Sequence, residues 1–326
     1  MSCRASAASS TDRARHHVNW LEYLISAFVG DRRARDQHTK ALVSGASIAT
    51  GLAELSKLCA ERSGQEGESP IFLLCAGWRS GSTLLQRLIM SDPAVMLWGE
   101  PYDECGVIQA LAGTLKAFRG GWPPPEYYYD GRPREQLTGD WIANLFPSAD
   151  ALRQGHRMFF ETVFAVPARQ AGAKRWGIKE VRLNAEHAHY LHWLFPKARF
   201  VFLLRNPLDA YRSYCRYGRN WYDTWPDRPV FTPTAFGTHW RELAEGFVRD
   251  APKLNALVIR YEDLIGPTQQ VVAKIEQHLD VRLDASIIGK KVGTSERGGE
   301  QAWISRLEKS LLWRAVSPLA EDLGYK

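Results

Sequence analysis

Short apolar segments alternate along the chain with longer segments in which apolar residues recur every three or four positions. The apolar segments cover residues 71–76, 175–180, 199–204 and 256–260. Continuous apolar runs of this length are typical of strands that are buried on both faces of a parallel sheet. The longer segments predict helices over residues 80–90, 185–195, 208–217, 233–251 and 269–279. Strands that alternate with helices in this way predict an α/β fold, in which helices flank a doubly wound parallel sheet.

The first 69 residues differ from the rest of the chain. Residues 1–20 are rich in Ser, Ala and Arg, and we expect disorder at the start of this segment. Residues 20–60 have the pattern of one or two amphipathic helices, and the polar, Gly-bearing segment 61–70 has the composition of a linker. We therefore expect a partly disordered helical extension over residues 1–69 and a main domain over residues 70–326.

Charge and hydropathy exclude several classes of protein. The formal net charge of +6 is compatible with an anionic ligand, but no basic stripe or nucleic-acid-binding motif accompanies it. No apolar run reaches the length of about 20 residues that a transmembrane helix needs. The N-terminus also lacks the apolar core of a secretory leader. We therefore expect a cytoplasmic protein without a membrane span.

The cysteine and histidine residues do not predict a metal site. The five cysteines form an odd set without C-x-x-C spacing, which favours a reducing compartment. Three histidines cluster at His187, His189 and His192, but only the last two share one face of a helix. Because the sequence offers no third ligand, we expect packing or surface histidines and no bound metal.

A loop with the sequence GWRSGST connects the first predicted strand of the main domain to the helix that follows it. Such a strand–turn–helix junction directs free backbone N–H groups at an anion. The glycines permit close approach of the backbone. The candidate anion-binding residues are Gly77, Arg79, Ser80, Gly81, Ser82 and Thr83. A nucleotide kinase would have a lysine where Ser82 stands, so the loop departs from an ATP site. A tight turn that binds no ligand is the alternative.

A second strand-to-helix junction, in the segment FVFLLRNPLDAYRSY, repeats this arrangement. Arg205 ends the predicted strand and Asn206 is a candidate helix cap. Ser213 lies about two helical turns further on and returns to the face of the cap. Arg205 and Ser213 can therefore contact one phosphate from two sides. The alternative is that Arg205 pairs with Asp209 and that Ser213 only occupies a helical position.

Together the two junctions resemble the nucleotide-binding motifs of sulfotransferases that use 3′-phosphoadenosine 5′-phosphosulfate (PAPS). FLLCAGWRSGSTLLQRLI is similar to their 5′-phosphosulfate loop, and FVFLLRNPLDAYRSY is similar to their 3′-phosphate motif. The RSGST form resembles the carbohydrate and tyrosylprotein branch of the family. The resemblance extends from residue 70 to the C-terminus. It implies a P-loop-like fold, a sulfotransferase domain over residues 70–326 and PAPS as the sulfuryl donor.

The resemblance also implies roles for individual residues. It places a catalytic base at Glu100 in MLWGEP and a catalytic lysine at Lys179 in GIKEVR, and it implies that Arg79 also acts on the sulfuryl group. The implied nucleotide contacts are Tyr261 in VIRYEDL and, in the looser match GKKVGTSERGG, Lys290, Lys291 and Ser295. The alternatives are that Glu100 and Lys179 are solvated charges at strand ends and that Tyr261 belongs to the core.

The implied reaction is an in-line transfer of the sulfuryl group to an acceptor hydroxyl, without a metal because side chains supply the cations. Trp221 and Trp225, in the Trp-rich segment 218–229, favour a glycan or a glycosylated or small-molecule metabolite as acceptor, because flat aromatic faces stack on sugar rings. A tyrosyl peptide is the alternative acceptor. Two other classes stay open, an ATP-dependent P-loop phosphotransferase and a nucleotide-binding protein without activity.

Overall fold

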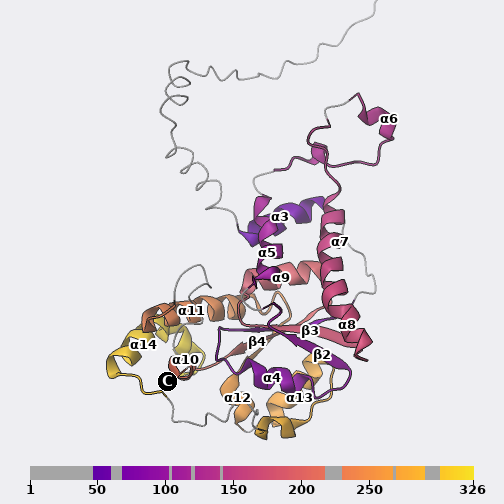
Figure 1. Ribbon diagram of the computed structural model, residues 1–326. Helices are drawn as coiled ribbons and strands as arrows, with labels where there is room; N and C mark the ends of the chain where they lie inside the picture. Colours follow the sequence, from indigo (N-terminus) through magenta and orange to yellow (C-terminus); the bar gives the residue numbers. More distant parts are fainter. Residues whose placement is uncertain are drawn as a thin grey trace, which may run out of the picture. The chain divides into compact units, whose positions relative to one another are not determined.

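Five parallel strands form one sheet within the part of the chain that the computed structural model describes. Those residues are 47–59, 68–102, 105–118, 122–139, 142–216, 230–266, 269–290 and 302–326. The strands are β1 (Ile71–Cys75), β2 (Val95–Gly99), β3 (Arg175–Glu180), β4 (Arg199–Leu204) and β5 (Leu257–Arg260), in the order β2-β3-β1-β4-β5. Every neighbouring pair is parallel, so the carboxyl ends of all five strands meet at one edge of the sheet (Figure 1).

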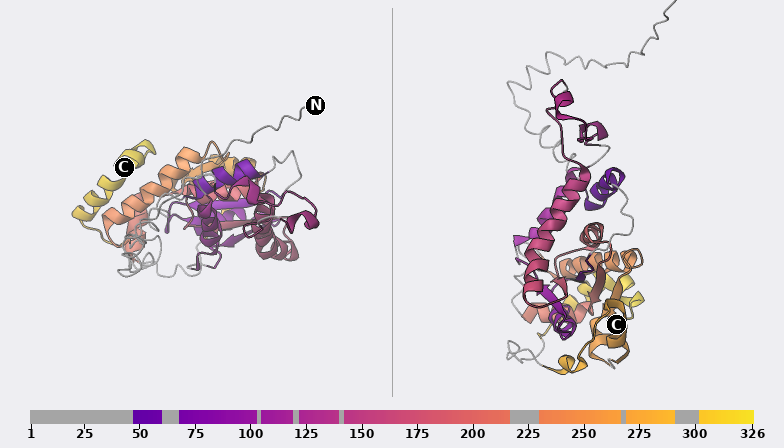
Figure 2. Two further views of the ribbon diagram at one scale, coloured as in Figure 1. Left: turned by 90° about the horizontal axis from the view of Figure 1, so that it is seen from above. Right: turned by 90° about the vertical axis from the view of Figure 1, so that its right-hand side faces the viewer.

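Helices cover both faces of this sheet (Figure 1). One face carries α3 (Ile48–Leu58), α5 (Val107–Gly113), α7 (Ala149–Phe160) and α9 (Ala185–Leu194), and the other carries α4 (Ser82–Ile89), α12 (Tyr261–Ile265) and α13 (Gln269–Leu279). The helices α11 (Pro233–Asp250) and α14 (Arg306–Asp322) run side by side, and α10 (Pro207–Arg216) packs against both (Figure 2). The shorter elements are α6 (Arg134–Leu137), α8 (Val166–Gln170), the 3₁₀ helices η2 (Thr114–Ala117), η3 (Pro125–Tyr127) and η5 (Ala285–Gly289), and the π-helix η4 (Glu161–Ala165).

The side chains of each central strand enter two hydrophobic clusters, one on each face of the sheet. Phe72 and Leu74 of β1 belong to the cluster that includes α3 and α9, whereas Ile71 and Leu73 belong to the cluster that includes α4 and α13. Successive side chains of a strand point to opposite faces, so a strand that is covered on both sides must be apolar throughout. This arrangement accounts for the continuous apolar runs in the sequence.

The doubly wound parallel sheet that the sequence predicts is confirmed, and with it the P-loop-like α/β fold. β3 and β4 have the predicted bounds, and β1 and β5 are each one residue shorter than predicted. β2 was not among the apolar runs, because this strand is only partly buried along its length. No described helix combines the length and the apolar character needed to cross a membrane.

The helix α3 lies within the segment that the sequence assigns to an N-terminal extension. Its side chains Ile48, Leu52 and Leu55 are buried in the same cluster as β1 and α9. Ser47 caps this helix by accepting a hydrogen bond from the backbone N–H of Thr50. The helix is therefore built into the core of the domain.

Candidate active site

The loop between β1 and α4 has the backbone geometry of an anion-binding turn. Gly77, Arg79 and Gly81 have φ angles of 80°, 66° and 88°, which lie in the left-handed region. Turns that contain left-handed residues gather successive backbone N–H groups into a concave nest for anions. The loop leads directly into α4, whose first N–H groups have no partner within the helix. Both features give the loop the capacity to bind a phosphate.

Gly81 is required at this position by its surroundings as well as by its φ angle. A Cβ atom on Gly81 would lie 2.1 Å from Cδ2 of Tyr261, a distance at which atoms overlap. Tyr261 follows β5 and begins α12, so the ring of one strand end packs directly on the loop of another. Tyr261, which the sequence predicts as a nucleotide contact, therefore lies directly against this loop, and its contact with a nucleotide stays a prediction.

The second anion-binding junction lies in direct contact with the first. Nη1 of Arg205 donates a hydrogen bond to the carbonyl oxygen of Arg79 at 2.7 Å, and Nε of Arg79 donates to Oγ of Ser213 at 2.8 Å. Asp209, the alternative partner of Arg205, instead pairs with Arg212 at 2.8 Å. The structure thus brings together Arg79, Arg205 and Ser213, which the sequence separates by up to 134 positions.

Neighbouring residues contact both the side chain and the carbonyl group of Arg205. Its guanidinium carbon lies 4.6 Å from the centroid of the Tyr261 ring, and its carbonyl oxygen accepts a hydrogen bond from Nε1 of Trp240 at 3.0 Å. Its Nε atom is buried and has no hydrogen-bond partner among the described residues. A buried donor without a partner is costly. An anion at this place would satisfy it.

The helix α12 joins both junctions to the end of β5. The ring of Tyr261 packs on Gly81, and Oε1 of Glu262 accepts a hydrogen bond from the backbone N–H of Asn206 at 2.8 Å. Asn206 in turn caps α10 by accepting from the backbone N–H of Leu208. Two neighbouring residues of α12 therefore position both candidate phosphate sites.

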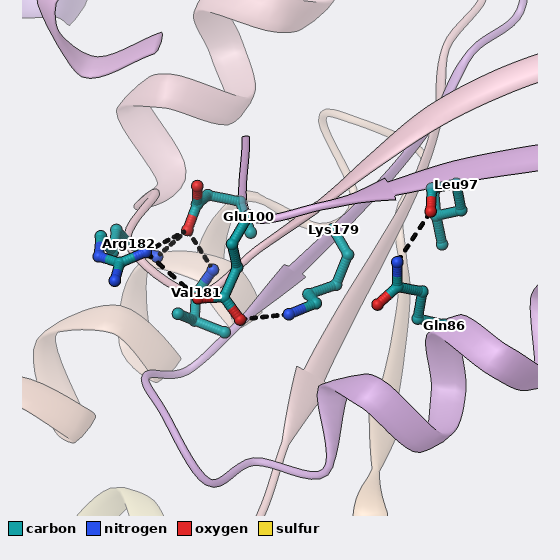
Figure 3. A network of polar contacts seen from close by, with 7 residues as sticks. Gln86, Leu97, Glu100, Lys179, Val181 and Arg182 are labelled. Carbon is teal, nitrogen blue, oxygen red and sulfur yellow. Dashed lines mark hydrogen bonds and ion pairs between the residues drawn. The ribbon is translucent and has the colours of Figure 1, made fainter. Parts of the chain in front are cut away.

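Glu100 and Lys179 meet at the same edge of the sheet (Figure 3). Gly99 of β2 is the register partner of Lys179 in β3, and the backbone N–H of Glu100 continues this pairing by donating to the carbonyl oxygen of Lys179. The ammonium group of Lys179 donates to Oε1 of Glu100. The side chain of Lys179 is 5% exposed and that of Glu100 is 27% exposed, so the carboxylate is the more accessible partner.

Backbone strain accompanies these strand ends. Arg79, Glu100 and Tyr102 all have positive φ angles, of 66°, 31° and 62°. Positive φ is uncommon for residues other than glycine, and its energetic cost is tolerated mainly at functional sites. The strain at Arg79 and Glu100 therefore supports their assignment to a site.

Two further charged residues, which the sequence reasoning missed, complete a buried network around Glu100. Nη1 of Arg182 donates to Oε2 of Glu100 at 3.2 Å and lies 3.6 Å from Oε1 of Glu180 (Figure 3). Oε1 of Glu180 also accepts from the backbone N–H groups of Val181 and Arg182, at 2.8 and 3.1 Å. The only local signal was the density of charge in the segment KEVR at the end of a predicted strand.

The pKa of Glu180 is raised to about 7, mainly by burial and further by the neighbouring carboxylate of Glu100. In the folded protein Glu180 therefore retains its proton up to a higher pH than in the unfolded chain. Folding stability from this group is present at low pH and is lost as the pH rises from about 4.5 to about 7. The loss is as much as about 3 kcal/mol.

Glu180→Gln is expected to remove this pH dependence, because glutamine keeps an acceptor for the two backbone N–H groups but does not ionise. Denaturant unfolding at about pH 5 and about pH 8 measures the effect. The wild-type protein should lose more stability between the two values than the variant does. The exposed Glu135→Gln is the control and should behave as the wild type. Parallel pH profiles for wild type and Glu180→Gln would contradict the prediction.

A pocket with aromatic walls adjoins Glu100. It has a volume of about 280 Å³ and is lined by Trp98, Gly99, Pro101, Tyr102, Val163 and Phe164. Gly99 and Pro101 are the chain neighbours of Glu100. Nε1 of Trp98 donates to the carbonyl oxygen of Phe164 at 3.0 Å, which ties β2 to the π-helix η4. Short π-helical turns are frequent at functional sites. The pocket therefore lies beside Glu100 in the chain, although Glu100 is not itself a lining residue.

Several predicted residues lie elsewhere or outside the described part of the chain. Lys290 is within 3.8 Å of Asp284, and its carbonyl oxygen accepts from Arg87 in the last turn of α4, not at the phosphate loop. Residues 217–229 and 291–301 lie outside the described residues, and with them Trp221, Trp225, Lys291 and Ser295.

Two of the three clustered histidines make contacts within the fold. Nδ1 of His187 accepts from the backbone N–H of Asn184 in the capping box of α9, and burial lowers the pKa of His187 to about 4. Nε2 of His189 lies 3.4 Å from Oδ2 of Asp250 on α11. Among the described residues, no group of three or more potential ligands has the geometry of a metal site.

Several solved structures similar to the chain are sulfotransferases, each with low sequence identity. The sulfotransferase domain of the olefin synthase from Synechococcus PCC 7002 is 18% identical, covers 82% of this chain and 99% of that chain, and has a TM-score of 0.44. The sulfotransferase domain of the curacin biosynthetic pathway is 17% identical, with coverage of 80% and 99% and a TM-score of 0.45. The sulfotransferase STF9 from Mycobacterium avium is 16% identical, with coverage of 91% and 86% and a TM-score of 0.41.

A search of curated protein sequences gives no significant match. A family model gives a clear one, because the model described as "Sulfotransferase family" matches residues 70–285. This match spans well over half of the chain and includes both candidate phosphate-binding junctions, Glu100 and Lys179. The chain therefore belongs to the sulfotransferase family.

Proposed function

We propose that this transferase moves the sulfuryl group of PAPS to a hydroxyl of a glycan or of a glycosylated or small-molecule metabolite by in-line displacement. Family membership implies PAPS as the sulfate donor. One observation carries the proposal for this chain. Two anion-binding junctions contact each other through Arg79, Arg205 and Ser213, and a carboxylate–ammonium pair lies at the same edge of the sheet.

The donor would bind across the two junctions. Backbone N–H groups and hydroxyls of residues 77–83 would hold the 5′-phosphosulfate end. Arg205 and Ser213 would exchange their present contacts with Arg79 for the 3′-phosphate, a charge-assisted interaction that distinguishes PAPS from ATP. Tyr261, which lies against both Gly81 and Arg205, is placed to contact the nucleotide.

The chemistry follows from the carboxylate and the cations. The acceptor oxygen attacks the sulfur atom, the bond from sulfur to the bridging phosphate oxygen breaks, and adenosine 3′,5′-bisphosphate (PAP) leaves. Glu100 takes the proton of the acceptor hydroxyl as the new S–O bond forms. Lys179 and Arg79 neutralise the charge that develops on the bridging oxygen and on the sulfuryl oxygens.

The acceptor would enter through the pocket beside Glu100. Its walls include the rings of Trp98, Tyr102 and Phe164, and flat rings stack well on sugar faces. The same rings also suit a phenol, so a tyrosyl peptide is the second candidate acceptor. Incubation with labelled PAPS and a panel of glycans, lipids, phenols and tyrosyl peptides tests this part of the proposal. A labelled product only from an acceptor class outside glycans, metabolites and tyrosyl peptides would overturn it.

Arg205→Ala is expected to weaken PAP binding by about 10- to 100-fold, because it removes a hydrogen bond to a charged group. Adenosine 5′-phosphate lacks only the 3′-phosphate, and its affinity should change by less than about twofold. Isothermal titration with both ligands measures the two affinities, and Arg205→Lys should give an intermediate loss. An equal loss for both ligands would contradict the role of Arg205 at the 3′-phosphate. ATP binding tighter than PAP binding in the wild type would favour a phosphotransferase instead.

A further inference from the structure

We propose that Arg182 is a positioning residue, which holds the carboxylate of Glu100 in place while Lys179 acts on the donor. The inference rests on the proposed function, because Arg182 is assigned a role only through Glu100 as the proposed base. It starts from the two hydrogen bonds that the carboxylate of Glu100 accepts. Lys179 donates to Oε1 and Arg182 donates to Oε2, so each oxygen of Glu100 has its own cation (Figure 3).

The ammonium group of Lys179 has two partners in the proposed reaction, Glu100 and the donor. It contacts Glu100 in this structure, and in the proposed reaction it stabilises the leaving oxygen of the donor. A base that loses its only partner at that moment would be free to rotate away from the acceptor. Because Arg182 contacts the other oxygen, Glu100 keeps its orientation, and Oε1 is left to accept the proton.

Arg182 is itself fixed more firmly than a surface arginine would be. Its side chain is 3% exposed, and its guanidinium carbon lies 4.6 Å from the centroid of the Trp78 ring. Oε1 of Glu180, a side chain that is 2% exposed, lies 3.6 Å from Nη1 of Arg182 and accepts from two backbone N–H groups. A buried guanidinium stays charged and needs such partners.

The contact with Trp78 adds a link between the base and the phosphate loop. Trp78 follows Gly77 and precedes Arg79, so the ring that covers Arg182 belongs to the loop proposed to hold the phosphosulfate. Arg182 therefore contacts both the catalytic base and the donor loop, and it fixes their relative position. Accurate placement of reacting groups is worth orders of magnitude in rate.

Arg182→Met tests the inference, since methionine fills much of the space without a charge or a fork of donors. We expect kcat to fall by about 10- to 100-fold, while the dissociation constant of PAP changes by less than about twofold. Arg182→Lys retains the charge but loses the planar geometry, so we expect a fall of intermediate size. Thermal unfolding checks that each variant folds, and Arg182→Lys keeps the test valid if Arg182→Met does not fold.

A double-mutant cycle with Glu100→Gln separates positioning from a general structural role. If Arg182 acts through Glu100, its replacement should lower the remaining rate of Glu100→Gln by less than about twofold. Arg153→Met is the matched control, because Arg153 also pairs with a carboxylate, Asp150, and lies over a tryptophan ring, Trp193. It should retain the wild-type kcat.

The outcomes distinguish the inference from the function on which it rests. Normal turnover in Arg182→Met, or equal fold-losses in the wild-type and Glu100→Gln backgrounds, would overturn the role of Arg182 alone. A wild-type protein that neither binds PAP nor turns over PAPS with any acceptor would overturn the proposed function and the inference together.

Discussion

Glu100→Gln is expected to lower kcat by a factor of about 10²–10⁴, the typical contribution of a general base. Glutamine has nearly the same shape, and its single amide oxygen can accept from Lys179 or from Arg182, so we expect the fold and the donor site to persist. It cannot take the proton of the acceptor hydroxyl. Steady-state turnover of PAPS with a saturating acceptor measures the loss, and PAP titration should give an affinity within about twofold of the wild type.

Glu135→Gln provides the matched control for this change, because Glu135 is an exposed glutamate on α6. Its turnover should equal that of the wild type. A Glu100→Gln protein with unimpaired kcat would remove Glu100 from the mechanism. A protein that also loses PAP binding would show that the carboxylate organises the donor site instead.

Lys179→Met is expected to lower kcat by about 10²–10³, because it removes one preorganised charge from the transition state. Lys179 is buried between β1 and β2, with register partners Leu73 and Gly99, so methionine fits the same apolar surroundings. The loss should appear mainly in kcat, since the charge that Lys179 neutralises develops only as the S–O bond breaks.

The control for Lys179 is Lys274→Met, an exposed lysine on α13, which should keep full activity. A Lys179→Met protein that shows a raised KM for PAPS and an unchanged kcat would assign Lys179 to ground-state binding and not to catalysis.

Local pattern was enough for four of the five strands but not for β2. β3 and β4 are buried along almost their whole length, so their apolar runs have sharp ends. β2 lies at the border of the sheet, where its burial is interrupted, and its sequence VMLWG offers only five residues to judge. α14 contains Pro318, a residue that argues against a helical interior, although the helix continues through it.

The site residues likewise fall into two groups. A local motif identifies some of them, and only contacts across the fold bring the others together. Each candidate phosphate-binding junction is a local motif, and its residues could be found from the strand, the turn and the helix cap. The pairing of Glu100 with Lys179 joins residues 79 positions apart through the register of β2 and β3, which no local pattern encodes. The resemblance supplied that pair. Arg182 was missed because its burial depends on Trp78, which arrives from a different strand end.

The attachment of α12 to both junctions has a consequence for how the protein is made on the ribosome. Residues 77–213 contain the side chains of the two proposed phosphate sites. The ring that packs on the first loop and the carboxylate that accepts from the backbone N–H of Asn206 come instead from Tyr261 and Glu262. A nascent chain that has emerged only as far as β4 and α10 lacks both of these supports. Competence to take up the nucleotide should therefore arise only after Tyr261 and Glu262 have left the exit tunnel.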